Sequence, residues 1–478
     1  MCWTGGATDG LLVFTDSWPD RGTSTTVLVL DIHMERSSSD PDADLAAFAQ
    51  RYATVRERTE RLAAPLSAED QMVQSMPDVS PTKWHRAHTT WFFAEFVLGA
   101  DGTSGRHWDL PEYRFLYNSY YEAVGARHPR PNRGLVTRPS SAAVAEYRAS
   151  VDKEMAELLS TGDVSPQLLD TMVLGTHHEE QHQELLLVDI KHVLSMNPAV
   201  GPAYSDVVVP PADDPGAADF VEFSGGIAEV GRSFGDVGRL ADGFMFDSEG
   251  PRHEVRVYDF RLADRLVTAG EWLEFIADGG YERPEFWKSD GWARAQSDGW
   301  NAPLYWRPDP DDPDAWWIHT LTGLRDVDPH EPVCHVSHYE ADAFASWAGA
   351  RLPTEFEWEV AAARQLELDP SAVERGCLDT SADSTFHPRA AGPRNGRLRQ
   401  LFGDCWEWTS SAYEPYPGFA PAVGAIGEYN GKFMSGQQVL RGGGALTPPG
   451  HTRVTYRNFF HPHTRWHLGG LRLAKDAS

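Results

Sequence analysis

Two histidine-bearing segments carry the side chains best suited to metal chemistry. The first contains His85 and His88, and the second reads His177-His178-Glu179-Glu180-Gln181-His182. On a helix, residues four apart share one face, so His178 and His182 point the same way. Two such imidazoles can chelate one metal ion, and His88 could supply a third nitrogen. Imidazole suits Zn, Cu, Fe and Ni, so the sequence predicts a histidine metal site and leaves the metal open.

Other interpretations of these histidines stay open. His85 and His177 could be ligands, hydrogen-bonding neighbours of the ligands or bystanders. The string from His178 to His182 also matches H-E-x-x-H, the zinc-protease pattern, in which Glu179 would deprotonate a metal-bound water. The third ligand that such proteases carry downstream is missing, and Glu184 and Asp189 are only weak substitutes for it, so a protease is the less favoured hypothesis.

Four helices are expected to position the histidines. Apolar residues recur every three or four positions over 45–59, as on one face of a helix. A second helix is expected to open at Ser80-Pro81, a third to cover 142–159, and a fourth to run for about 31 residues from Ser165-Pro166. With a long irregular crossover at 103–140, this pattern predicts a four-helix bundle with ligands that project inward.

The second half of the chain has a different character. The segment 201–219 is rich in Pro, Ala and Asp and is expected to be a linker. Beyond it, short strand-like runs alternate with Gly, Pro, Trp and two short helices, at 269–277 and 339–348. The sequence therefore predicts a helical domain at 44–200 and an α+β domain at 220–478. Residues 1–43 are expected to be a disordered extension.

Composition excludes several classes of function. The 478 residues include 42 Lys and Arg against 70 Asp and Glu, a net charge of −28, which disfavours nucleic acid and anionic membranes as partners. No stretch approaches the roughly 18 apolar residues of a membrane span, and no basic segment opens a signal peptide. The 4 cysteines are far apart, which excludes a disulfide scaffold and fits a cytoplasmic protein.

The second domain carries motifs specific enough to indicate a family. They are Arg351-Leu352-Pro353-Thr354-Glu355-Phe356-Glu357-Trp358-Glu359, Gly403-Asp404-Cys405-Trp406-Glu407-Trp408-Thr409, Arg441-Gly442-Gly443 and Gly470-Leu471-Arg472-Leu473-Ala474. The series resembles the formylglycine-generating-enzyme/sulfatase-modifying domain, which implies a C-type-lectin-like α+β fold. Formylglycine-generating enzymes hold copper with a cysteine pair near the C-terminus. The last cysteine here is Cys405, so that chemistry is not expected.

The first domain resembles a DinB-like four-helix bundle, through residues 83–93 (KWHRAHTTWFF) and the segment around His178. The two domains in this order resemble the ergothioneine-biosynthesis sulfoxide synthases, or hercynine oxygenases, over about residues 44–476. The resemblance implies a non-haem Fe(II) held by His88, His178 and His182. It implies an oxidoreductase that uses O₂ to join the thiol of cysteine or γ-glutamylcysteine to the imidazole C2 of hercynine (Nα-trimethylhistidine), giving a sulfoxide.

The same resemblance assigns further roles. Tyr120 and Tyr121 match a tyrosine pair in one branch of the family, where one of the two donates a proton. The candidate substrate contacts offer aromatic faces for the trimethylammonium cation or polar groups for the two substrates, and they are Arg130, Arg133, Gln181, Asn458, Phe459 and Phe460. Plain packing, or a solvated loop for the two arginines, is the alternative explanation of these residues.

Substrate choice is the least determined part of the resemblance. Phe459-Phe460 replaces the Trp-Asp of the branch that uses γ-glutamylcysteine, which favours cysteine as the donor. That branch also has a catalytic tyrosine in its second domain, for which Tyr429 is a poorly matched counterpart. A selenium-transferring relative, an enzyme for unmethylated histidine and an inactive lectin-like module stay as alternatives. A structural Ca²⁺ in the C-terminal domain is also expected from the family.

Overall fold

The computed structural model describes residues 41–100, 106, 108, 110–197, 201, 203–204, 213–233, 243–312, 315–378, 384, 386–394, 397–421, 427 and 430–477. The predicted extension lies outside these residues as far as residue 40, and so does Tyr429. Much of the predicted linker, including 205–212, is outside them as well.

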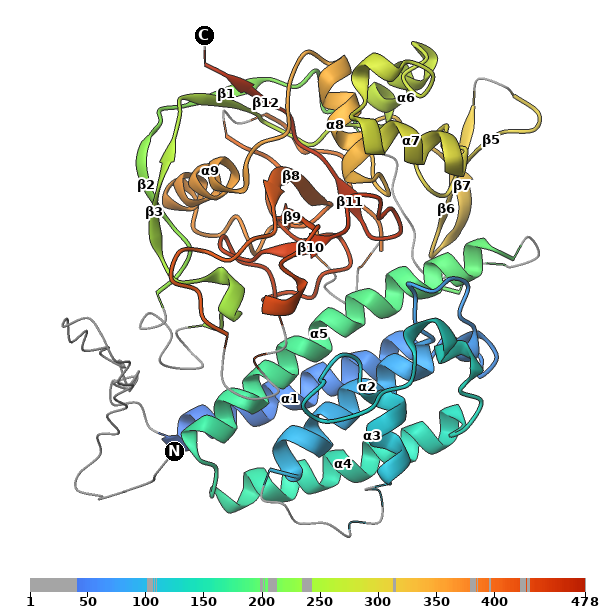
Figure 1. Cartoon of the computed structure of the whole chain (residues 1–478), viewed down its shortest axis with the longest axis vertical. Coiled ribbons are helices and arrows are strands. Elements are labelled where there is room, and N and C mark those ends of the chain that lie inside the picture. Colours follow the sequence, from blue (N-terminus) through green and yellow to red (C-terminus); the bar gives the residue numbers. More distant parts are fainter. Residues whose placement is uncertain are drawn as a thin grey trace, which may run out of the picture. The chain divides into compact units, whose positions relative to one another are not determined.

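Four long helices form the N-terminal domain, as the sequence predicts (Figure 1). They are α1 (Pro41–Ala63), α2 (Thr82–Phe93), α4 (Ser141–Thr161) and α5 (Pro166–Ser195). α2 packs against both α4 and α5, and α1 packs against α5. The crossover between α2 and α4 holds a π-helical turn, η2 (Ala94–Leu98), the short helix α3 (Pro111–Tyr117) and a 3-10 helix, η3 (Arg130–Leu135). Within the described residues, no helix is both long and apolar enough to cross a bilayer.

The helix starts follow the local sequence with one exception. The hydroxyls of Ser140 and Ser165 accept hydrogen bonds from the third residue of α4 and α5, as N-caps do. Ser80 was expected to cap α2, but Pro81 occupies the N-cap position. The Ser80 hydroxyl instead accepts from Arg133, 2.8 Å away, and its N–H donates to Asp189 at 2.7 Å. The Ser80 prediction is wrong because tertiary partners take both groups.

The C-terminal domain is α+β with short strands, as predicted. Its helices are α6 (Ala269–Ala277), α7 (Ser289–Asp298), α8 (His338–Trp347) and α9 (Glu355–Leu368). Its described strands are β1 (Phe220–Phe223), β2 (Gly226–Val230), β3 (His253–Val257), β4 (Phe260–Ala263), β5 (Trp306–Pro308), β6 (Trp316–Thr320), β7 (Gly323–Asp326), β8 (Trp406–Ala412), β9 (Gln438–Arg441), β10 (Asn458–Phe460), β11 (Gly469–Gly470) and β12 (Ala474–Asp476).

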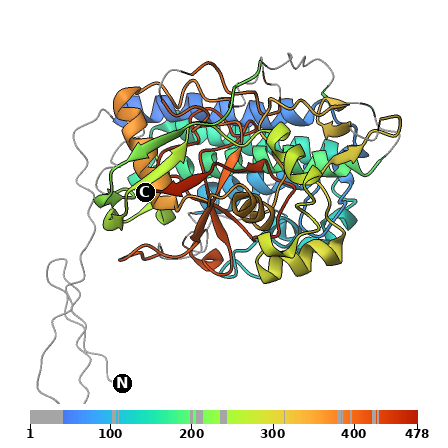
Figure 2. The ribbon, with the colours of Figure 1, turned by 90° about the horizontal axis from the view of Figure 1, so that it is seen from above.

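These strands form small separate sheets rather than one large one. The strand orders are β1-β4-β12, β10-β9-β8-β11, β2-β3 and β5-β6-β7 in the part of the chain that the structure describes. β2 and β3 pair antiparallel over five residues each and lie side by side in both ribbon views (Figures 1 and 2). β10 brings Asn458, Phe459 and Phe460 to the edge of the central sheet, beside β9.

Buried ion pairs explain the structural role of the motifs in this domain. Glu355, from the Arg-Leu-Pro-Thr-Glu segment, binds Arg441 at 2.8 Å and Arg457 at 2.9 Å. Glu407, from Trp-Glu-Trp-Thr, binds Arg472 at 2.9 Å. All five side chains are at most 2% exposed. A buried charge needs a partner, so these motifs hold the loops of an irregular fold together.

Candidate functional site

His88 of α2 meets His178 and His182 of α5 inside the bundle. Ring nitrogens of the three side chains all lie within 4.8 Å of one another. The Nε2 atoms of His88 and His178 are 3.1 Å apart. Ligands about 2.1 Å from a metal lie roughly 3 to 3.5 Å from each other, so this spacing fits one ion. The structure thus brings together the three histidines that the sequence predicts as ligands.

The surroundings of these imidazoles favour the neutral form that binds metals. Burial lowers the pKa of His88 and His182 well below the usual value, and it lowers the pKa of His178 to about 3. His88 Nδ1 donates to the backbone oxygen of Tyr117 at 2.6 Å, and the ring stacks on Trp84 with centroids 4.6 Å apart. With Nδ1 protonated, a neutral His88 carries its lone pair on Nε2, which faces the other histidines.

The two extra histidines lie behind this centre. His85 Nδ1 is 2.8 Å from His182 Nδ1. His177 turns away and contacts Glu180 at 3.0 Å, and Glu180 also contacts His451 at 3.0 Å. This second cluster could in principle hold a metal. The Arg51 guanidinium already pairs with Glu180 at 2.7 Å, however, so the buried carboxylate is neutralised without one.

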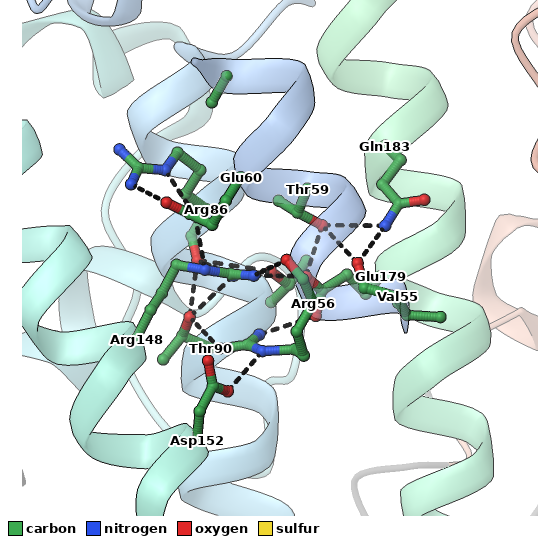
Figure 3. A network of polar contacts seen from close by, with 12 residues as sticks. Val55, Arg56, Thr59, Glu60, Arg86, Thr90, Arg148, Asp152, Glu179 and Gln183 are labelled. Carbon is green, nitrogen blue, oxygen red and sulfur yellow. Dashed lines mark hydrogen bonds and ion pairs between the residues drawn. The ribbon is translucent and has the colours of Figure 1, made fainter. Parts of the chain in front are cut away.

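Glu179 faces a different network on the other side of α5 (Figure 3). Its carboxylate binds Arg56 and Arg148 at 2.8 Å each and accepts a hydrogen bond from Thr59 at 2.6 Å. Burial alone would raise the pKa of Glu179, but the two guanidinium groups hold it at about 2. A carboxylate held this way does not accept a proton from water at neutral pH. The geometry therefore does not support the zinc-protease hypothesis.

A cavity of about 310 Å³ opens beside the histidines, between α5 and the C-terminal domain. His178 and His182 form part of its wall. Six of the other predicted site residues also line it: Tyr120, Arg130, Gln181, Asn458, Phe459 and Phe460. Two of the three predicted metal ligands and most of the predicted substrate contacts therefore share one cavity.

Within each predicted pair from the crossover, one residue lines the cavity and the other does not. Tyr120 is on the wall, whereas Tyr121 is buried and packs against Phe96 with ring centroids 4.9 Å apart. Arg130 is on the wall, whereas Arg133 lies with its guanidinium carbon 3.4 Å from the ring centroid of Trp84. Arg133 also donates to two serine hydroxyls. The prediction that Arg133 contacts the substrate is not supported, because its guanidinium is engaged inside the bundle.

The aromatic pair of β10 both packs and lines the cavity. Phe459 stacks on Tyr413 with centroids 4.1 Å apart, and Phe460 stacks on His467 at 4.3 Å. The two explanations offered for this pair are therefore compatible. Sequence reasoning missed several further aromatic wall residues, which are Trp406, Phe433, Tyr456 and Trp466. Trp406 belongs to the Trp-Glu-Trp-Thr motif, which is the signal that could have pointed to it.

Two polar residues of α5 connect the cavity wall to the C-terminal domain. Gln181 Nε2 donates to the Tyr456 hydroxyl at 2.7 Å. Glu184, one turn later on the same face, accepts from Trp406 Nε1 at 2.6 Å and from the Thr447 hydroxyl at 2.7 Å. Burial raises the pKa of Glu184 to about 7, against the smaller lowering effect of these two hydrogen bonds. The sequence offered Glu184 only as a weak substitute for the third ligand of a zinc-protease site.

Glu184 makes stability depend on pH. Because its folded pKa is raised, the folded state binds the extra proton between about pH 4.5 and 7, so the unfolding free energy falls as pH rises through that window, by at most about 3 kcal/mol. We expect Glu184→Gln to remove this slope, measured by urea unfolding at pH 5 and pH 8. Glu157→Gln, at an exposed position of α4, is the control. If the unfolding free energy falls by the same amount from pH 5 to pH 8 in wild type and in Glu184→Gln, the slope does not come from Glu184.

The calcium prediction finds no counterpart. Among the described residues, neither group of three His, Cys, Asp or Glu side chains that could hold a metal lies wholly within the C-terminal domain. Nothing in the structure therefore supports a calcium site there.

Comparison with known proteins agrees with this architecture. Residues 51–186 match the DinB superfamily, and residues 207–477 match the Sulfatase-modifying factor enzyme 1-like domain. A formylglycine-generating enzyme from Streptomyces coelicolor is 29% identical over 304 residues, which is 54% of this chain and 89% of that protein.

Two relatives align with both domains. The hercynine oxygenase of Mycolicibacterium smegmatis is 36% identical over 451 residues, covering 90% of this chain and 98% of the relative. The hercynine oxygenase of Mycolicibacterium thermoresistibile is 33% identical over 456 residues, covering 90% of this chain and 95% of the relative. The chain belongs to the hercynine oxygenase family and is an oxidoreductase.

Proposed function

We propose that this protein is an Fe(II)- and O₂-dependent sulfoxide synthase of ergothioneine biosynthesis, with hercynine and cysteine as substrates. The observation that carries the proposal is the convergence of three imidazoles, those of His88 and His178 buried and that of His182 partly buried, on one point beside a cavity. Three neutral nitrogen donors suit Fe(II) and leave about three coordination positions open. His88, His178 and His182 would hold the ion.

The reaction balances with O₂ as the only oxidant. Forming the C–S bond from the imidazole C2–H and the thiol S–H releases two electrons, and oxidising the sulfur to the sulfoxide releases two more. These four electrons reduce one O₂, whose two atoms become the sulfoxide oxygen and the oxygen of one water molecule. Bound Fe(II) supplies O₂ activation and a place where the thiolate and the imidazole meet. The protein supplies orientation of both substrates, which removes most of the entropic cost of a three-body encounter.

The cavity wall offers the groups that hercynine needs. The trimethylammonium group of hercynine is a permanent cation, and aromatic faces attract it without any ion pair. The wall carries such rings from both β10 and the loops beside it, including Phe433, Phe459 and Phe460. Gln181 and Asn458 add amide groups for the polar part of the substrate. We assign this aromatic side of the cavity to hercynine.

The thiol donor is assigned to the crossover side of the cavity. Arg130 provides a guanidinium group that can pair with the substrate carboxylate. Phe459-Phe460 stands where the branch that uses γ-glutamylcysteine carries Trp-Asp, and the absence of that Asp favours cysteine. Equimolar cysteine and γ-glutamylcysteine in one reaction should give mainly the cysteine adduct, read by mass spectrometry. A larger yield of the γ-glutamyl adduct would overturn the preference for cysteine.

Tyr120 is the proposed proton donor, because it lines the cavity and Tyr121 does not. The two hydroxyls are 3.5 Å apart, so Tyr121 is placed to support the Tyr120 hydroxyl. We expect Tyr120→Phe to lower the ratio of sulfoxide to simply oxidised cysteine by about 100-fold, since general-acid groups contribute on that scale. Tyr121→Phe should lower it less. Chromatographic product ratios measure both, and unchanged ratios in both variants would remove tyrosine from the mechanism.

Oxygen uptake tests the proposed activity as a whole. The metal-free chain is loaded with Fe(II) without oxygen, and O₂ consumption is then followed with hercynine alone, cysteine alone and both together. Rapid uptake is expected only with both substrates. The Zn(II)-loaded chain is the control and should consume no O₂. If neither cysteine nor γ-glutamylcysteine supports uptake with hercynine, the substrate assignment fails.

A further inference from the structure

The outer nitrogen of His182 meets another histidine. This nitrogen, Nδ1, lies 2.8 Å from Nδ1 of His85, a residue of α2 that is 2% exposed. The other His85 nitrogen, Nε2, lies 3.0 Å from Oδ2 of Asp189, which is also 2% exposed. A chain of hydrogen bonds thus runs from a buried carboxylate through one imidazole to a second.

The direction of each hydrogen bond in this chain can be worked out. Asp189 Oδ2 already accepts from the backbone N–H of Ser80 at 2.7 Å, so it acts as an acceptor here. The His85 Nε2 that faces it is then the donor. This leaves His85 Nδ1 as the acceptor toward His182, so His182 Nδ1 is the donor between the two rings. His182 in turn keeps its Nε2 lone pair for the metal.

We propose that Asp189 and His85 form a positioning dyad that fixes the tautomer and the ring orientation of His182. This inference rests on the proposed metal centre. Metal-bound histidines commonly donate their outer N–H to a carboxylate or a carbonyl, and this contact strengthens the ligand and fixes its angle. Here the imidazole of His85 stands between the ligand and the carboxylate, so Asp189 acts on His182 through His85.

The same geometry excludes the simpler roles for His85. Both of its nitrogens are engaged, one by His182 and one by Asp189, so it has no lone pair left for the metal. It is also more than a packing residue, because an apolar side chain at this position would leave the His182 N–H buried without an acceptor. Without that acceptor the His182 ring could rotate, and either of its nitrogens could face the metal centre.

Metal affinity tests the dyad without relying on turnover. The full-length metal-free chain is titrated with Co(II) against a competing chelator. We expect His85→Ala to weaken binding about 10- to 100-fold and to change the visible Co(II) absorption bands, as loss of an outer-shell partner does. Asp189→Asn keeps the shape of the side chain and removes its charge, and it should weaken binding less. His177→Ala, which removes a neighbouring buried imidazole outside the dyad, is the control and should bind like wild type.

The possible failures are distinguishable. If wild type binds no Co(II), the proposed metal centre itself fails. If wild type binds and both His85→Ala and Asp189→Asn bind within twofold of it with unchanged spectra, the dyad is overturned and the metal centre stands. Circular dichroism checks folding, and if His85→Ala does not fold, the Asp189→Asn titration and spectrum decide alone. An equal loss of affinity in His177→Ala would also overturn the dyad, because any buried change beside the metal centre would then suffice.

Discussion

Replacing His178 by alanine should remove metal binding and lower turnover on the order of a thousandfold or more. His178 is 1% exposed and its Nε2 lies 3.1 Å from that of His88, so no other side chain can take its place without rebuilding the bundle. The two remaining imidazoles would bind a divalent ion weakly. Loss of the ion removes its whole contribution to the barrier, which is several kcal/mol for metal-assisted chemistry.

Metal content and oxygen uptake measure this effect together. Elemental analysis of the Fe(II)-loaded chain should find about one iron in wild type and little in His178→Ala. His128→Ala removes a histidine that does not line the cavity, and it should match wild type in both measurements. A His178→Ala protein that keeps one iron and normal turnover would place the metal elsewhere.

The second large effect concerns stability, at the network of Figure 3. Arg148 is 2% exposed and binds Glu179 at 2.8 Å and Glu60 at 2.7 Å. We expect Arg148→Met to lower the unfolding free energy by about 3 to 5 kcal/mol, because Glu179 would keep only Arg56 as a charged partner inside the bundle. Urea or guanidinium unfolding measures the loss.

A surface pair on the same helix is the matched control. Lys153 and Glu157 of α4 are 3.8 Å apart and are 77% and 65% exposed. Lys153→Met should change stability by no more than about 0.5 kcal/mol. If Arg148→Met and Lys153→Met lower the unfolding free energy by the same amount, the buried network does not hold the four helices together. Fe(II) binding by folded Arg148→Met then shows how far the network also supports His178, the neighbour of Glu179.

Regular periodicity explains which parts of the site could be predicted. His178 and His182 are four residues apart on a long helix, so their common face follows from helix geometry. The crossover has no such period. Nothing in the order Tyr120-Tyr121, or in the spacing of Arg130 and Arg133, says which member of each pair faces the cavity. That choice is made by packing against Trp84 and Phe96, which only the folded bundle shows.

Contacts between distant segments explain what was missed. Glu184 meets Trp406, 222 positions away, and its raised pKa comes from burial that no local pattern reports. The sequence predictions also missed α9. Its start signal was present, since Thr354 and Glu357 form a capping box, but both residues lie in a motif that was used only to identify the family. The role of His85 depends on its contact with Asp189 of α5, a residue that the sequence offered only as a weak substitute for a third zinc ligand.

Labelling with ¹⁸O₂ separates the proposed reaction from simple oxidation of cysteine. The Fe(II)-loaded chain is given hercynine and cysteine under ¹⁸O₂, and the products are read by mass spectrometry. We predict one product that contains both substrates joined through sulfur, with a single oxygen-18 atom at the sulfoxide, and we predict its absence in His178→Ala. Oxygen uptake that yields only oxidised cysteine, or a coupled product without the label, would contradict the proposed reaction.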